Sequence, residues 1–170
     1  MSLQWFHLIA STYGSWLPGD ERGFRTRHHR EHIEGDYRDP PPEGTYVMHQ
    51  LHAESQQRFD TVIIPPDLRS VIGTAIRERL VVLRGRVLTI SVSGQHVHLQ
   101  AQLNADDARI PLGAAKKHAW FIAREHGWTG KLWALRPKII RTRSHQKNVH
   151  YYILAHAKEG AWVWSAIEHR

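Results

Sequence analysis

The chain has 170 residues, a length that suits one compact domain with a buried core. It contains no cysteine, which excludes disulfides, thiolate metal sites and cysteine nucleophiles and fits a cytoplasmic location. No apolar run approaches the roughly 20 residues of a membrane helix, so no membrane partner is expected. The net charge of +7 favours polyanions such as nucleic acid, although a basic protein without such a partner can have the same composition.

The N-terminal third is predicted to be one strand followed by an irregular segment. The strand is QWFHLIAST, residues 4–12. From about residue 14 to 58, Pro18-Gly19 and the run Pro40-Pro41-Pro42 break both helix and strand. We therefore expect a single domain over residues 1–170 with a long irregular insertion at about 14–58.

Regular structure is predicted to resume at Pro65 with a helix. Its apolar residues follow the spacing of one buried stripe and are Leu68, Val71, Ile72, Ala75, Ile76 and Leu80. A hairpin of two half-buried strands follows, with Gly94 in the turn. Its core-facing residues are predicted to be Leu88, Ile90 and Val92 on the first strand, then Val97, Leu99, Ala101 and Leu103 on the second.

A second helix is predicted from about Leu112 to His126, then a strand in KIIRTR, residues 138–143. Ser144 can cap a last helix that ends at Gly160. The first six elements follow the β-α-β-β-α-β order of a ferredoxin-like (split β-α-β) α+β fold. We expect an antiparallel sheet with helices on one face, a free second face, and a C-terminal helix that carries tyrosine.

The stretch SGQHVHLQAQL contains two histidines one residue apart. A strand period of two places His96 and His98 on the polar face together with Gln100 and Gln102. Two imidazoles on one face can bind one cation. Because 14 histidines in 170 residues give about one His-x-His triplet by chance, an exposed pair without a metal remains the alternative.

The last helix brings a tyrosine and a third histidine to one face. Tyr152 and His156 are four residues apart, so they lie one helical turn from each other. A tyrosine hydroxyl beside a metal ligand can attack a phosphodiester. The alternative is a packing helix with Tyr152 at its rim. Tyr151 is the competing nucleophile, but its i+4 residue is Ala155, which cannot bind metal.

These residues carry a resemblance to a known family. His96-Val97-His98 resembles the His-hydrophobic-His motif of the HUH endonucleases, and Tyr152 with His156 resembles their single-tyrosine helix. The family is matched further by two other stretches, WFHLIASTYGSWLPGDERGF and KLWALRPKIIRTR. The similarity therefore covers nearly the whole chain. The family is the insertion-sequence 200-like transposases and the REP-associated tyrosine transposases.

The resemblance implies metal-dependent cleavage and rejoining of single-stranded DNA next to hairpins. Tyr152 would be the nucleophile that forms a 5′-phosphotyrosine, and His96 and His98 would hold Mg²⁺ or Mn²⁺. The place of the third ligand, often glutamine or asparagine in the family, is His156 here. An imidazole there favours Mn²⁺ or a later metal. Relatives occur as dimers and as monomers, so a homodimer stays open.

Basic residues in three regions are candidate DNA contacts, with solvated surface charge as the alternative. They are Arg25 and Arg27 in the insertion, Lys116 and Lys117 on the second helix, and Arg141 and Arg143 on the last strand.

A non-catalytic hairpin DNA-binding protein derived from such a transposase is the alternative function. A ferredoxin-like RNA-binding module is disfavoured because the polar face lacks base-stacking aromatics.

Overall fold

The chain divides into two compact units in this computed structural model. One unit joins Met1–Tyr13 to Val62–Arg170, and the other is Gly14–Thr61. A compact unit is not by itself an independently folding domain, so the single domain over residues 1–170 stays a prediction. The described residues are 3–20, 24–25, 32–33, 42–104 and 108–167.

The larger unit is built on a five-stranded antiparallel sheet with the order β6-β1-β5-β4-β7. Its strands are β1 (Leu3–Ser11), β4 (Arg86–Val92), β5 (His96–Asn104), β6 (Lys138–Arg141) and β7 (Trp162–Ser165). The long strands β1 and β5 pair at the centre of the sheet. The first four strands of this unit follow the expected chain order, which confirms the predicted α+β fold.

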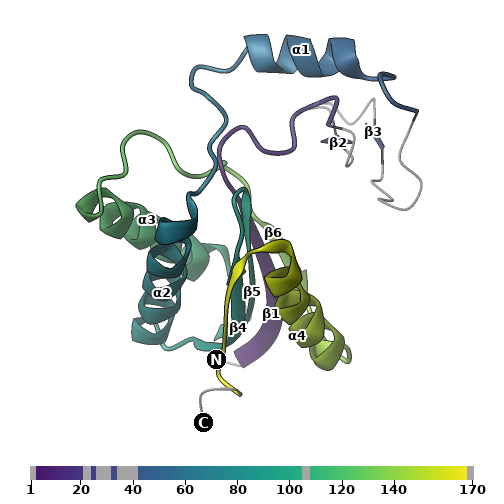
Figure 1. Ribbon diagram of the computed structural model, residues 1–170. Coiled ribbons are helices and arrows are strands. Elements are labelled where there is room, and N and C mark those ends of the chain that lie inside the picture. Colours follow the sequence, from purple (N-terminus) through teal and green to yellow (C-terminus); the bar gives the residue numbers. More distant parts are fainter. Residues whose placement is uncertain (1–2, 21–23, 26–31, 34–41, 105–107, 168–170) are drawn as a thin grey trace. The chain divides into compact units, whose positions relative to one another are not determined.

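Two helices, α2 (Pro66–Val82) and α3 (Arg109–Glu125), cover one face of this sheet (Figure 1). The predicted stripe of α2 is buried apart from the half-buried Val71. It belongs to one core cluster with the alternate apolar residues Phe6 and Leu8 of β1 and Leu99 of β5. No described helix is both long and apolar enough to cross a membrane.

The opposite face of the sheet is covered by α4 (Gln146–Ala155), which continues into the short 3-10 helix η1 (His156–Glu159) (Figure 1). Val149 and Ile153 of α4 are buried, and the sheet residues Thr89 and Gln100 are fully buried. The expectation of a free second face is therefore wrong. Polar residues on that face predict solvent contact, but here they meet polar groups of the last helix.

A β-bulge changes which residues of β4 face the core, so the predicted inward face of this strand is wrong in part. The register with β5 shifts between Val87 and Thr89, so Leu88 is the extra residue. Val87 joins Ile90 and Val92 in the core, whereas Leu88 is only half-buried. Strict alternation cannot predict this, because an extra residue moves every preceding side chain of the strand to the other face.

The chain after Gly160 contains a strand that the sequence pattern did not predict. Gly160 ends η1 in the left-handed conformation, with φ of 77°, as the predicted stop signal requires. The four residues of β7 then pair with β4 at the edge of the sheet. The expected Ser144 cap is also wrong, because His145 is the N-cap residue and no side chain caps the helix.

The smaller unit is more regular than expected. Phe24–Arg25 (β2) pairs with His32–Ile33 (β3), and Val47–Ser55 form helix α1. The prediction of a long irregular insertion at about 14–58 is therefore wrong over these residues. None of the residues of α1 is buried, and its apolar residues Val47, Met48 and Leu51 are exposed.

Replacement of Gly73 tests the packing of α2 against β7. A Cβ at Gly73 would overlap the indole ring of Trp162. Although alanine normally stabilises a helix by about 1 kcal/mol over glycine, we expect Gly73→Ala to lower the free energy of unfolding by about 1–3 kcal/mol. Urea denaturation measures the change.

Gly113 on α3 provides the matched control, because a Cβ there would meet nothing within 4 Å. Gly113→Ala should raise the free energy of unfolding by about 0.5–1 kcal/mol. Equal stabilisation by both substitutions would show that Trp162 does not pack against α2.

Candidate metal centre and tyrosine

The strand β5 directs His96 and His98 away from the helices α2 and α3. Val97 and Leu99, which alternate with them, lie in the core. His98 is buried and His96 is half-buried, and their ring centroids are 4.8 Å apart. The predicted common face of these two histidines is thus present in the structure.

Helix α4 is held on this face by two polar contacts as well as by its apolar residues. The side-chain Nε2 of Gln100 donates to the carbonyl of Gln146 at 2.9 Å. Further along, the hydroxyl of Thr89 is hydrogen-bonded to Nδ1 of His150. Both sheet residues are fully buried, and a buried group that loses its partner costs about 1–3 kcal/mol. These contacts fix the position of α4 on the sheet.

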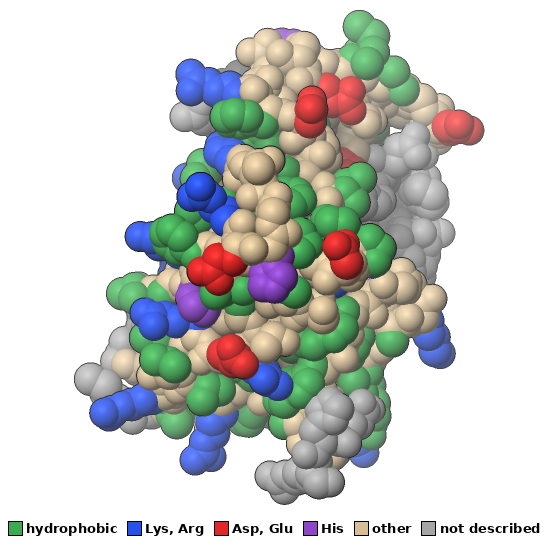
Figure 2. Space-filling model, turned by 60° about the vertical axis from the view of Figure 1, so that its left-hand side comes forward, with side chains coloured by type: hydrophobic (Ala, Val, Ile, Leu, Met, Phe, Trp, Pro, Cys, Tyr) green, Lys and Arg blue, Asp and Glu red, His purple; other side chains and the backbone are tan. Residues whose placement is uncertain are grey.

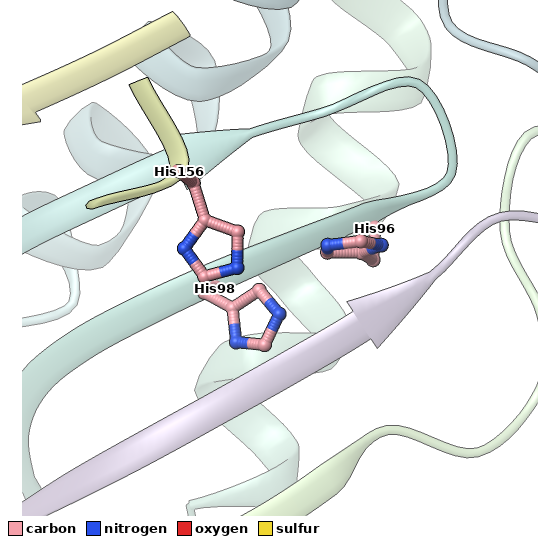
Figure 3. Close-up of side chains that lie close together, drawn as sticks. All are labelled: His96, His98 and His156. Atoms are coloured by element: carbon pink, nitrogen blue, oxygen red, sulfur yellow. The ribbon is translucent and has the colours of Figure 1, made fainter. Parts of the chain in front are cut away.

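The end of α4 brings His156 to the two strand histidines (Figure 3). One potential ligand nitrogen from each of His96, His98 and His156 lies within 4.8 Å of the others. The ring of His156 stacks on that of His98, with centroids 4.5 Å apart. No other such group of histidine and acidic side chains occurs within the described residues. Three imidazoles are a suitable donor set for a divalent transition metal.

A backbone contact fixes the tautomer of His156. Its Nδ1 lies 3.0 Å from the carbonyl oxygen of Tyr152, one helical turn earlier. A carbonyl can only accept, so Nδ1 carries the proton and Nε2 of the neutral ring keeps a lone pair. Metal-binding histidines in proteins are oriented in this way.

A fourth histidine, His7, lies beside the group and was missed in the sequence. Its Nε2 is 3.0 Å from Nδ1 of His98. His7 is buried on β1 and points to the same face of the sheet as His98, because Phe6 and Leu8 on either side belong to the core. Alternation in QWFHLIAST could have placed His7 on that face. Its partner follows only from the pairing of β1 with β5.

The rings of His7 and His98 are neutral at physiological pH, because the pKa of each is lowered well below 6.5. Burial is the main cause that lowers the pKa of His98 far below 6.5, and the nearby His96, His156 and His7 lower it further. Burial likewise lowers the pKa of His7 to about 4, followed by repulsion from His156, Lys138 and His145. A neutral imidazole binds a metal without first losing a proton.

Tyr152 is the tyrosine that lies next to the histidine group. Its ring packs edge-on against His156, at 4.8 Å between centroids, and against His98 at 5.4 Å. With 51% of its surface exposed, Tyr152 remains open to a substrate. The ring of Tyr151 instead lies against His150. Of these two tyrosines, Tyr152 is therefore the one whose ring contacts the histidine group.

One predicted DNA contact is wrong. Lys116 is buried, and its Nζ donates to the carbonyl of Ala134 at 2.8 Å. Its position near the start of a helix suggested exposure, but its long side chain reaches inward to cap a loop carbonyl. Lys117 is exposed, with its Nζ 5.9 Å from the centre of the Phe121 ring.

The remaining basic candidates differ in the face they occupy. Arg141 is exposed but pairs with the core residue Phe6, so it projects to the helix-covered side rather than to the histidines. Arg143 is exposed just before α4. Arg27 and the side chain of Arg25 lie outside the described part of the chain.

Lys138 of β6 is a basic residue on the histidine face that the sequence reasoning missed. It pairs with Ile9, which pairs with His98 on its other side. Residues directly opposite in a sheet project to one face. Figure 2 shows another face of the molecule, on which basic, acidic and apolar side chains are mixed. The net charge alone therefore does not locate a DNA-binding surface.

Comparison with known proteins gives structural similarity only. No family model and no curated protein matches the chain. A REP-associated tyrosine transposase bound to a REP hairpin is 13% identical, with a TM-score of 0.43 over 92% of this chain and 68% of the other. The chain resembles a second transposase structure. That protein, from Deinococcus radiodurans R1, is 12% identical, with a TM-score of 0.44 over 94% of this chain and 92% of the other. At these values neither structure identifies residues of the site.

Acid should destabilise the metal-free protein. The pKa of folded His7 is lowered from 6.5 to about 4, whereas the unfolded chain binds that proton near the ordinary value. Between these two values the unfolded state binds more protons, so the free energy of unfolding falls as the pH falls. We expect the urea midpoint of chelator-treated protein to drop from about pH 6.5 to about pH 4.

The variant His7→Gln removes one of the titrating groups and should show a weaker drop. His126→Gln, at an exposed position after α3, should keep the wild-type pH dependence. An identical drop in His7→Gln and wild type would contradict a neutral, buried His7.

Proposed function

We propose that this protein is a metal-dependent, single-tyrosine DNA transposase or nickase. It cleaves and rejoins single-stranded DNA through a 5′-phosphotyrosine intermediate. The observation that carries the proposal is the convergence of three histidines with the half-exposed ring of Tyr152. The net charge of +7 supports a polyanionic substrate.

The residues present fit a divalent metal. His96, His98 and His156 would hold it, and the contact of His156 with the carbonyl of Tyr152 leaves its Nε2 for the ion. Three nitrogen donors favour Mn²⁺ or a later metal, because Mg²⁺ prefers oxygen ligands. A bound ion supplies Lewis acidity that withdraws charge from a non-bridging phosphate oxygen.

Tyr152 performs the covalent step. Its phenolic oxygen attacks phosphorus and forms a new P–O bond, while the bond between phosphorus and the 3′ oxygen breaks. The phenol loses its proton to solvent, and the departing oxygen gains one and leaves as a 3′-hydroxyl. The number of phosphodiester bonds is unchanged, so no external energy source is required.

The same residue makes the step reversible. Phenolate is a reasonable leaving group, so a 3′-hydroxyl can attack the phosphotyrosine and release Tyr152. Exposure of 51% of Tyr152 leaves room for either DNA strand at the phosphorus. Lys138, on the same face, is placed to neutralise a neighbouring phosphate.

Loss of the Tyr152 hydroxyl should abolish covalent attachment to DNA. The probe is a pool of single-stranded oligonucleotides that carry a stem-loop between random flanks, labelled at the 3′ end because that fragment stays on the tyrosine. With Mn²⁺, wild-type protein should give a labelled protein band on a denaturing gel. The band should be absent from Tyr152→Phe and from chelator-treated samples.

Tyr151→Phe is the matched control and should retain the band, because its ring lies against His150 and not against the histidine group. A band that persists in Tyr152→Phe would assign the nucleophile to another residue. Hairpin binding without any covalent band in wild type would indicate the non-catalytic DNA-binding protein.

A further inference from the structure

His7 lies next to the proposed metal centre without belonging to it. Its Nε2 is 3.0 Å from Nδ1 of His98, and the two ring centroids are 5.2 Å apart. The nitrogens that converge on one point belong to His96, His98 and His156. Because the Nε2 of His7 already contacts His98, it cannot bind the same ion at the same time.

The strand pairing holds His7 firmly in this place. On β1, His7 pairs with Gln100, and Ile9 pairs with His98, so the contact between the two histidines runs diagonally across the central strand pair. Only 8% of the surface of His7 is exposed. The ring therefore cannot turn into solvent without disturbing the middle of the sheet.

The chemistry of an imidazole pair gives this contact a direction. His98 has two ring nitrogens, and in the neutral ring one carries the proton while the other keeps a lone pair. Nδ1 of His98 faces His7, so the nitrogen available to the group is Nε2. For Nε2 to keep its lone pair, Nδ1 must carry the proton and donate a hydrogen bond to Nε2 of His7.

We propose that His7 is a positioning residue, which accepts a hydrogen bond from Nδ1 of His98 and thereby directs the lone pair of His98 Nε2 toward the metal. The proposal rests on the metal centre of the proposed function. His156 is oriented in the same manner by a carbonyl. Two of the three ligands thus have an acceptor behind them, and loss of such a partner typically weakens metal binding about 10–100-fold.

His7 also contacts the proposed nucleophile. Its ring lies edge-on to that of Tyr152, with centroids 5.8 Å apart. A purely structural role would need only a ring of this shape at position 7. A positioning role needs in addition an acceptor atom where Nε2 lies, and this difference makes the proposal testable.

Two variants separate these roles. His7→Phe keeps an aromatic ring and removes the acceptor. His7→Gln loses the ring but places its Oε1 near the position of the original Nε2. We expect Mn²⁺ affinity, measured by calorimetry, to fall about 10–100-fold in His7→Phe and to stay within a few-fold of wild type in His7→Gln. Circular dichroism and thermal unfolding check that both variants fold.

The tautomer of His98 provides a readout without metal or activity. Long-range ¹H–¹⁵N correlation spectra of the wild-type protein with chelator should show the proton of His98 on Nδ1. The spectra should show the same tautomer in His7→Gln and a shift toward protonated Nε2 in His7→Phe. The wild-type spectrum is informative even if His7→Phe fails to fold, because a proton on Nε2 of wild-type His98 overturns the proposal.

The two readouts separate failure of this inference from failure of the proposed function. Equal Mn²⁺ affinity and an unchanged His98 tautomer in His7→Phe would overturn the role of His7 while the metal centre stands. Absence of Mn²⁺ binding by wild-type protein would overturn the metal centre and the role of His7 with it. A weaker affinity in His7→Phe that His7→Gln restores would support both.

Discussion

The packing of α4 on the polar face of the sheet is the contact on which the whole candidate site depends. Tyr152 and His156 are far from His98 in the sequence. No local interaction can therefore bring them to His98. The contacts that do so are few. Gln100 reaches the first carbonyl of α4, and Thr89 reaches His150 in its middle. Both contacts are made by polar residues of the sheet that are completely buried.

This arrangement makes the packing specific. Apolar contacts of Val149 and Ile153 favour burial but tolerate sliding along the sheet, because the hydrophobic effect has no direction. A buried hydrogen bond is lost when its partner moves, so Gln100 and Thr89 fix the rotation and the axial position of the helix. The end of α4 then delivers His156 to the strand histidines with Tyr152 one turn before it.

Burial has a second consequence for the histidines. The environment that excludes water from His7 and His98 disfavours their charged forms and keeps their lone pairs available. It also makes the metal-free fold sensitive to acid. A metal bound to His98 would oppose this acid sensitivity, because it would bind the neutral ring and compete with protons for it. The availability of the histidine lone pairs and the sensitivity of the fold to acid thus have the same cause, which is the desolvation of the rings.

Much of the fold was predictable because it depends on local patterns. The stripe of α2 and the alternation of β1 and β5 follow directly from burial on one side. The extra residue Leu88, the exposed helix α1 and the four-residue β7 lack such a pattern and were missed. Within the candidate site, spacing alone pairs His96 with His98 and Tyr152 with His156. The neighbours His7 and Lys138 depend on strand register, which periodicity within one strand cannot supply.

The most direct test of the central claim is the location of Mn²⁺ in crystals of the protein grown with the ion, measured by anomalous scattering. The account predicts a peak within bonding distance of imidazole nitrogens from His96, His98 and His156, with the ring of Tyr152 alongside. Peaks elsewhere at saturating Mn²⁺, with none among these three histidines, would contradict it.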